Sequence, residues 1–183
     1  MTRRKRSRET SPSDRPLVVN GWQIFAHPLF LDQLARLVAA VELESRKDPD
    51  GYKSGANAKL LASIHKLAFE TIPEDPSRAV YRQGNTLGGE LRHWFRAKFG
   101  RQRFRLFFRY RADPKIIVYA WVNDEQSKRT YASKSDAYAV FKAMVDSGNP
   151  PNGWDDLLEA CRKAAPSQPL SRLRDLIHRF GPR

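Results

Sequence analysis

A run of basic residues separated by hydrophobic ones is the part of this chain best suited to chemistry. Residues 91–111 contain eight Lys or Arg side chains and no Asp or Glu. The eight are Arg92, Arg96, Lys98, Arg101, Arg103, Arg105, Arg109 and Arg111. Alternate residues of a strand point to opposite faces of a sheet, so a hairpin here would carry fixed cations on one face. Such a surface favours a polyanionic ligand, with RNA as the leading candidate.

Clustered cations can support RNA cleavage without a metal ion. The ribose 2′-OH can attack the neighbouring phosphate, so the protein must move protons and stabilise charge that develops on the phosphate. Arg and Lys suit the second task, and Lys or Tyr can move protons when nearby cations lower its pKa. The hairpin lacks the paired carboxylates of a two-metal nuclease, and four scattered His with one Cys do not predict a zinc site. We therefore expect no metal and no other cofactor.

Strand parity selects a smaller group within the basic run. With strands at 91–99 and 103–110, Arg96, Lys98, Arg103 and Arg105 are expected on one surface of the hairpin. The remaining cations of the run are expected to add general attraction to RNA phosphates. Trp94 and Phe107 could stack on bases, and a place in the core is at least an equal alternative for both.

Hydrophobic periodicity predicts the elements that position these residues. A short strand at 18–25, interrupted at Asn20-Gly21, is predicted before the first two helices. After the two hairpin strands, a further strand at 115–122 is apolar on both faces, which is typical of a buried strand. Helices are predicted at 28–45, 56–72, 135–147, 154–164 and 170–179. The expected fold is a two-layer α+β domain. Its antiparallel sheet has about four strands, with the two early helices on one face and the cations on the other.

Charge divides the chain into three parts. The net charge is +13, and residues 1–16 hold six basic and two acidic side chains. We predict a disordered basic tail over 1–16, a domain over 17–160 and a basic helical extension over 161–183. The single cysteine, Cys161, permits no intrachain disulfide, which favours a cytoplasmic location. No apolar run predicts a secretion signal or a membrane span, so no membrane partner is expected.

Several motifs resemble a known toxin family. The run 93–110, His-Trp-Phe-Arg-Ala-Lys-Phe-Gly-Arg-Gln-Arg-Phe-Arg-Leu-Phe-Phe-Arg-Tyr, is similar to the core of the RelE/ParE toxin superfamily. More closely, the chain resembles the YhaV toxins of type II toxin–antitoxin systems over roughly residues 18–155. The further stretches that carry this likeness are Asn20-Gly-Trp22 with Ala26-His-Pro28, Lys59-Leu-Leu61 with His65-Lys66, Trp121-Val-Asn-Asp-Glu125 with Arg129-Thr-Tyr131, and Asp136-Ala-Tyr138.

This resemblance implies an mRNA interferase with a RelE-like fold. Such a toxin is a metal-independent endoribonuclease that cuts mRNA on the ribosome and is held by a cognate antitoxin, here of AbrB-like (PrlF) type. The family's two basic residues on the first hairpin strand and its Arg on the next fall on Arg96, Lys98 and Arg105. Its later basic residue and helical Tyr match Arg129 and Tyr138, and Tyr131 competes with Tyr138 for the proton-transfer role.

Two other functions remain open from the sequence. One is a toxin with the same fold that inhibits gyrase by binding, without catalysis. The other is an RNA- or ribosome-binding module that performs no reaction.

Overall fold

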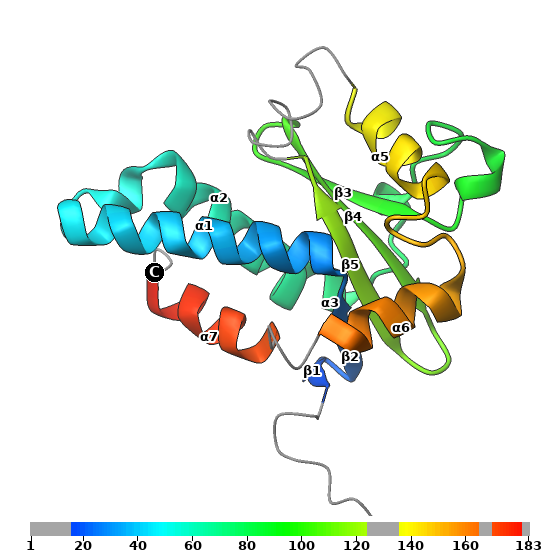
Figure 1. Cartoon of the computed structure of the whole chain (residues 1–183), viewed down its shortest axis with the longest axis horizontal. Helices are drawn as coiled ribbons and strands as arrows, with labels where there is room; N and C mark the ends of the chain where they lie inside the picture. The colour runs from blue at the N-terminus through cyan, green and yellow to red at the C-terminus, as the bar shows by residue number, and fades with distance from the viewer. Residues whose placement is uncertain (1–15, 124–135, 165–169, 181–183) are drawn as a thin grey trace, which may run out of the picture.

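The fold is built on a five-stranded mixed sheet with helices on both faces (Figure 1). The computed structural model describes residues 16–123, 136–164 and 170–180. The strands are β1 (Leu17–Val19), β2 (Trp22–Ala26), β3 (Phe95–Phe99), β4 (Phe104–Arg111) and β5 (Ile116–Val122). Their order across the sheet is β1-β2-β5-β4-β3. Strand β2 runs parallel to β5, and the other neighbours are antiparallel.

The expectation of an antiparallel sheet of about four strands is wrong in two respects. The segment expected as one interrupted strand forms two, because Asn20 (φ 49°) and Gly21 (φ 79°) make a tight turn between β1 and β2. The helices that follow β2 carry the chain across the sheet, so that β2 and β5 pair in parallel with Gln23 opposite Ile116. The α+β class itself is confirmed.

The first two helices form where the sequence predicts them. Helix α1 (Pro28–Lys47) begins with a proline, and the Nδ1 atom of His27 accepts a hydrogen bond from the backbone N–H of Leu29 at 3.3 Å. Burial lowers the pKa of His27 to about 4, although Asp32 opposes this, so the ring is neutral and able to accept. Helix α2 (Ala56–Lys66) continues through a π-helical turn at Leu67–Thr71 into the short α3 (Ile72–Glu74).

The sheet separates two hydrophobic cores. One core lies between the sheet and α1, α2 and α7 (Leu170–Phe180), and it includes Leu106 and Phe108 of β4. The other lies beneath α5 (Ala137–Asp146) and α6 (Trp154–Ala164) and is centred on Phe141. The ring of Phe141 lies 4.1 Å from that of Phe107, centroid to centroid, and 5.0 Å from that of Trp94.

This second core corrects the expected position of the cations. The sequence predicted that the sheet face opposite α1 and α2 would be an open cationic surface. Instead α5 and α6 cover much of that face, because Trp94, Phe107 and Trp121 supply a second set of large apolar side chains. The cations therefore lie around the margins of this core in separate groups.

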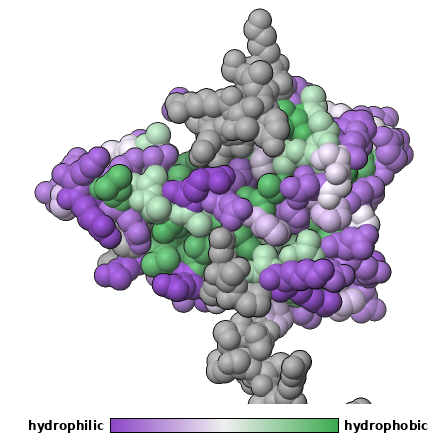
Figure 2. Space-filling view, viewed as in Figure 1, coloured by the Kyte–Doolittle hydropathy of each residue, from purple (hydrophilic) through white to green (hydrophobic). Residues whose placement is uncertain are grey.

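Helix α7 is packed against the domain. Leu170, Leu173 and Ile177 belong to the first core, and Figure 2 shows hydrophobic residues where α1 and α7 meet, framed by hydrophilic ones. The boundary predicted at 160/161 falls inside α6, where Cys161 is 1% exposed. The three-part division of the chain stays a prediction, and residues 1–15 of the predicted tail lie outside the described residues. Within the described ranges, no helix is long and apolar enough to cross a membrane.

Candidate active site

Arg96, Arg105 and Tyr138 meet at one end of the β3–β4 hairpin. Arg96 on β3 donates a hydrogen bond from Nε to the hydroxyl of Tyr138 at 2.8 Å. The guanidinium carbon of Arg105 on β4 lies 5.2 Å from the centre of the Tyr138 ring. Residues 42 positions apart in the chain are thus joined, because α5 lies across the hairpin. The structure brings together three residues that the sequence assigned to one site.

Lys98 joins this group through the strand register. Lys98 and Arg105 are paired across β3 and β4, and Arg96 is paired with Phe107 two residues away. Side chains at paired positions lie on the same face, so Arg96, Lys98 and Arg105 share the face on which Tyr138 lies. Within the described residues, none of these three cations forms an ion pair with a carboxylate.

Further contacts fix the orientation of the two arginines. Arg96 donates from Nη1 to the backbone carbonyl of Val80 at 2.6 Å, which ties β3 to the preceding loop. Arg105 donates from Nη1 to the carbonyl of Gln102 at 3.4 Å. Its Nε is buried and has no hydrogen-bond partner among the described residues, so this donor is left unsatisfied.

The two arginines also change the acidity of Tyr138. Its side chain is largely buried, and burial alone raises the pKa of its hydroxyl. Hydrogen bonding and positive charge from Arg96 and Arg105 lower that pKa by more, so the net pKa lies below the usual value of 10.0. The phenol is therefore a stronger acid than a free tyrosine.

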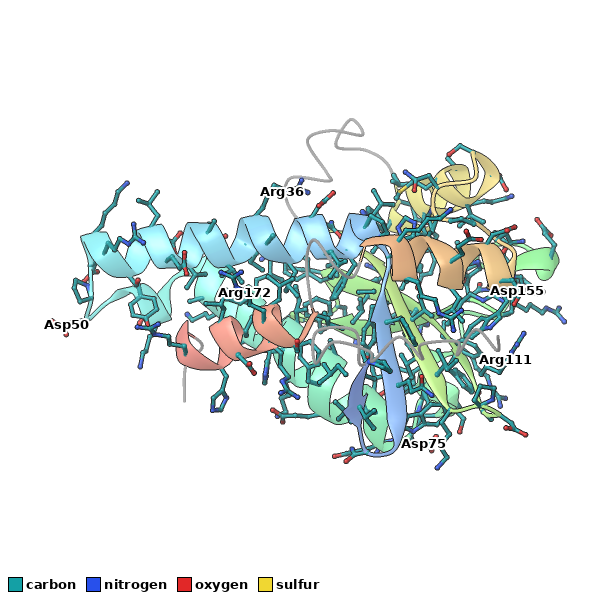
Figure 3. All side chains as sticks on the ribbon, turned by 60° about the horizontal axis from the view of Figure 1, so that its bottom comes forward. Arg36, Asp50, Asp75, Arg111, Asp155 and Arg172 are labelled. Atoms are coloured by element: carbon teal, nitrogen blue, oxygen red, sulfur yellow. The ribbon has the colours of Figure 1, made fainter. Side chains whose placement is uncertain are left out.

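Arg101 and Arg103 lie away from this group, which corrects the prediction for Arg103. Gly100, Arg101 and Gln102 all have positive φ and form a turn, so strand alternation stops at Phe99 and resumes at Phe104. Arg101 and Arg103 line an open groove of about 820 Å³ on the opposite side of the hairpin. Arg36 of α1 and Lys59 of α2 line the same groove, and Figure 3 shows Arg36 on α1.

Arg109 and Arg111 form a third group near the far end of β4. Arg109 donates to the carbonyl of Asn152 at 2.6 Å, and its guanidinium lies 5.3 Å from the ring centres of both Trp94 and Trp154. The guanidinium of Arg111 also lies over the ring of Trp154, 4.7 Å from its centre. Burial and the nearby Arg111 lower the pKa of Arg109 to about 10, which leaves it charged at neutral pH. Arg109 lies four positions beyond Arg105 along β4, a span of about 13 Å.

Trp94 is a core residue in this structure. Its side chain is 0% exposed, and its indole Nε1–H donates to Oδ1 of Asn152 at 3.0 Å. The expectation that Trp94 stacks on a base is therefore wrong, because no face of the ring is open. Arg92 is exposed and donates to Oδ1 of Asn85 at 2.7 Å, outside the group around Tyr138.

Two predicted site residues, Arg129 and Tyr131, lie outside the described residues.

One polar residue near the site, Asn123, was not identified from the sequence. Asn123 is 5% exposed and is bonded to the backbone at both Arg103 and Arg105. Its signals in the sequence were its place directly after a buried strand and within the family-like stretch at 121–125.

No cluster of metal ligands accompanies the basic site. Within the described parts of the chain, no three His, Cys, Asp or Glu side chains are close enough together to hold a metal ion. The groups around Tyr138 are cations, which repel a divalent metal and attract a phosphate.

In this α+β fold, two arginines meet at a tyrosine of lowered pKa, and such a group of side chains is suited to binding a phosphate. A family model described as "Toxin with endonuclease activity, of toxin-antitoxin system" matches residues 24–162. The chain belongs to this family, the YhaV toxins, and is the toxin of a toxin–antitoxin pair with endonuclease activity.

Curated relatives agree with this assignment. "Toxin YhaV" of Escherichia coli O6:H1 is 46% identical over 147 residues, which is 80% of this chain and 96% of the relative. "Ribonuclease toxin YhaV" of Escherichia coli K12 is 47% identical over 145 residues, which is 79% of this chain and 94% of the relative. No solved structure matches significantly.

Proposed function

We propose that this toxin is a metal-independent endoribonuclease that cuts mRNA at the site formed by Arg96, Lys98, Arg105 and Tyr138. The observation that carries this proposal is the meeting of Arg96 and Arg105 at Tyr138. The name of the Escherichia coli K12 relative, a ribonuclease toxin, supports RNA as the substrate.

The geometry suits attack by the ribose 2′-hydroxyl. The 2′ oxygen bonds to phosphorus, the bond from phosphorus to the 5′ oxygen breaks, and the leaving oxygen takes a proton. Arg96, Lys98 and Arg105 stabilise the negative charge on the phosphate in the transition state.

Tyr138 supplies the proton to the departing 5′ oxygen. Arg96 already donates a hydrogen bond to the phenolic oxygen, so the hydroxyl's own proton is left to be donated elsewhere. The lowered pKa of Tyr138 makes this transfer easier. Lys98 and Tyr131 are the candidates for removing the 2′-OH proton, and Arg129 is a further cation for the phosphate, because a guanidinium stays protonated.

The finer features implied by the family resemblance belong to the same proposal. They are a RelE-like fold, action on ribosome-bound mRNA in the cytoplasm, and an antitoxin of AbrB-like type. Arg92, Arg101, Arg103, Arg109 and Arg111 contribute attraction to RNA phosphates. Charge complementarity favours an antitoxin with acidic groups opposite these cations.

Cleavage of mRNA in EDTA tests the proposal. We expect the purified protein to cut RNA with EDTA present and to leave 2′,3′-cyclic phosphate and 5′-hydroxyl ends. Arg105→Ala should cut at least 100-fold more slowly, the scale found when a donor to transition-state charge is lost. Arg172→Ala, an exposed cation on α7, is the matched control and should cut normally.

Parallel reactions with and without ribosomes separate the alternatives. Intact RNA under both conditions would leave a non-catalytic toxin or a binding module. Cleavage within about threefold of wild type in Arg105→Ala would remove the site assignment while leaving the activity.

A further inference from the structure

We propose that Asn123 is a positioning residue that holds Arg105 in place against Tyr138. The inference rests on the proposed role of Arg105. Asn123 is 5% exposed and bonds to the backbone of Arg105, so it acts through Arg105 and not on the substrate.

The side chain of Asn123 completes the sheet at the point where β4 begins. Its Oδ1 accepts the backbone N–H of Arg105, at 2.5 Å, and its Nδ2 donates to the carbonyl of Arg103 at 3.2 Å. The backbone N–H of Asn123 donates to the carbonyl of Arg105 at 3.4 Å. Asn123 thus bonds to backbone groups of Arg103 and Arg105, on both sides of Phe104. These bonds extend the pairing of β4 with β5 by one residue beyond Val122.

The residue before Asn123 is held by a buried side-chain amide from α1. Gln33 is 8% exposed, donates from Nε2 to the carbonyl of Val122 at 2.7 Å, and accepts from the N–H of Val122 at 3.0 Å. Both bonds fix the last residue of β5, directly before Asn123. Helix α1, the end of β5 and the start of β4 are therefore linked by hydrogen bonds made by two side-chain amides.

The turn before Arg105 makes this support necessary. Arg101 (φ 56°) and Gln102 (φ 68°) adopt the left-handed region that non-glycine residues rarely occupy. Such a turn persists only where surrounding contacts hold it. The carbonyl of Gln102 also accepts the bond from Arg105 Nη1, so a shift of the turn would move both the backbone and the guanidinium of Arg105.

The electrostatic consequence follows from the same geometry. Arg105 is one of the two cations that lower the pKa of Tyr138 and one of those that face the phosphate. Loss of the Asn123 bonds would let Arg105 move away from the phenol. A displacement of about 1 Å in an active site can reduce a rate 100-fold.

A double-mutant cycle on cleavage of a short RNA tests the role of Asn123. Asn123→Ala should lower kcat about 10- to 100-fold, with a smaller change in KM, in protein whose circular dichroism spectrum is unchanged. In the Arg105→Ala background the same Asn123→Ala change should have little further effect, because Asn123 acts through Arg105. Equal losses in both backgrounds would overturn the proposal and make Asn123 a purely structural residue.

Two further variants serve as a control and as a replacement for Asn123→Ala. Gln83→Ala is the control, because Gln83 is also buried and also bonds two backbone groups, Leu91 O and Leu87 N–H, but makes no bond to Arg105. It should lower stability while kcat stays near wild type. If Asn123→Ala does not fold, Asn123→Asp retains the acceptor for Arg105 N–H and replaces it in the cycle.

Failure of this inference is distinguishable from failure of the proposed function. Loss of activity in Arg105→Ala together with normal kcat in Asn123→Ala would overturn only the role of Asn123. Normal cleavage by Arg105→Ala would overturn the proposed site and the positioning role with it.

Discussion

Tyr138 illustrates how a few contacts can turn an ordinary side chain into a reactive one. Burial in a hydrophobic cluster raises the pKa of a tyrosine, because it disfavours the charged phenolate, so such a tyrosine is a weak proton donor at neutral pH. Here Phe107 packs edge-on to its ring while Arg96 and Arg105 approach the hydroxyl and the ring face. The same residue is thus part of a core and part of the proposed site.

The acid role of Tyr138 predicts a specific pH dependence. Tyr138→Phe should reduce kcat about 100- to 10,000-fold, the range for loss of a general acid. In the wild type, kcat should fall as pH rises through the Tyr138 pKa, because the phenolate has no proton to donate. That pKa is lowered, so the fall should begin below pH 10.

Arg96→Gln provides the matching control for this assignment. It removes one of the two charges that lower the Tyr138 pKa, so the alkaline fall in kcat should move to higher pH. Rates are measured after subtraction of uncatalysed RNA hydrolysis. An alkaline limb that is the same in wild type and Arg96→Gln would assign the titration to another group.

At the scale of elements, the sequence predicted most helices and the strands β4 and β5 to within about two residues, because each depends on local periodicity. The strand predicted at 91–99 begins only at Phe95, because Gly89–Leu91 form a 3-10 turn. Helix α6 has the predicted bounds, and α1 and α7 differ by one or two residues at their ends. The parallel pairing of β2 with β5 could not be predicted, since it depends on contacts between residues about 90 positions apart.

The site was partly predictable for the same reason. Strand alternation placed Arg96, Lys98 and Arg105 on one face, and that depends only on neighbours in the chain. Strand alternation did not predict that Trp94 and Phe107 pack against Phe141 and that this packing buries most of the sheet face carrying Arg96, Lys98 and Arg105. It also failed at Arg103, where three successive residues with positive φ interrupt the alternation.

Helix α7 offers a test of how an element outside the family match contributes to stability. The match to the family ends at residue 162, whereas Ile177 of α7 is 1% exposed in the first core. Ile177→Ala should lower the free energy of unfolding by about 2–4 kcal/mol, because it removes buried methyl groups and leaves a cavity. Denaturant titration measures this change.

Arg172→Ala on the exposed face of the same helix is the control and should change the free energy of unfolding by less than about 0.5 kcal/mol. Equal small effects for both variants would mean that α7 is not docked in solution. Ile177→Ala should cleave RNA normally at temperatures where it is folded, since α7 supplies no residue to the proposed site.

At the scale of the whole molecule, the basic residues fall into separate groups, and we expect the cations of the proposed site and those of residues 1–16 to have different roles. In Figure 3, Asp50 lies at one end of the molecule, and Asp155 and Arg111 lie toward the other. Arg96, Lys98 and Arg105 have no carboxylate partner among the described residues. Residues 1–16 add six basic and two acidic side chains outside the family match.

This arrangement predicts that RNA affinity and catalysis respond to different charges. Changing Arg3, Arg4, Lys5 and Arg6 to Ser should weaken RNA binding at low salt and flatten the dependence of log affinity on log salt. Four lost phosphate contacts would reduce the slope by up to about 3, because each contact with a single strand contributes about 0.7. Binding is measured by fluorescence anisotropy with a labelled RNA from 50 to about 200 mM salt.

The same variant should keep the wild-type kcat at saturating RNA, because none of the four residues is among those proposed to contact the scissile phosphate. Lys98→Ser is the contrasting variant, since it removes one charge from the site and should lower kcat while changing the salt slope by less than about 1. A loss of kcat in the tail variant would contradict this separation and place the N-terminal cations at the reacting phosphate. An unchanged salt slope in that variant would instead confine the attraction for RNA to the folded part of the chain.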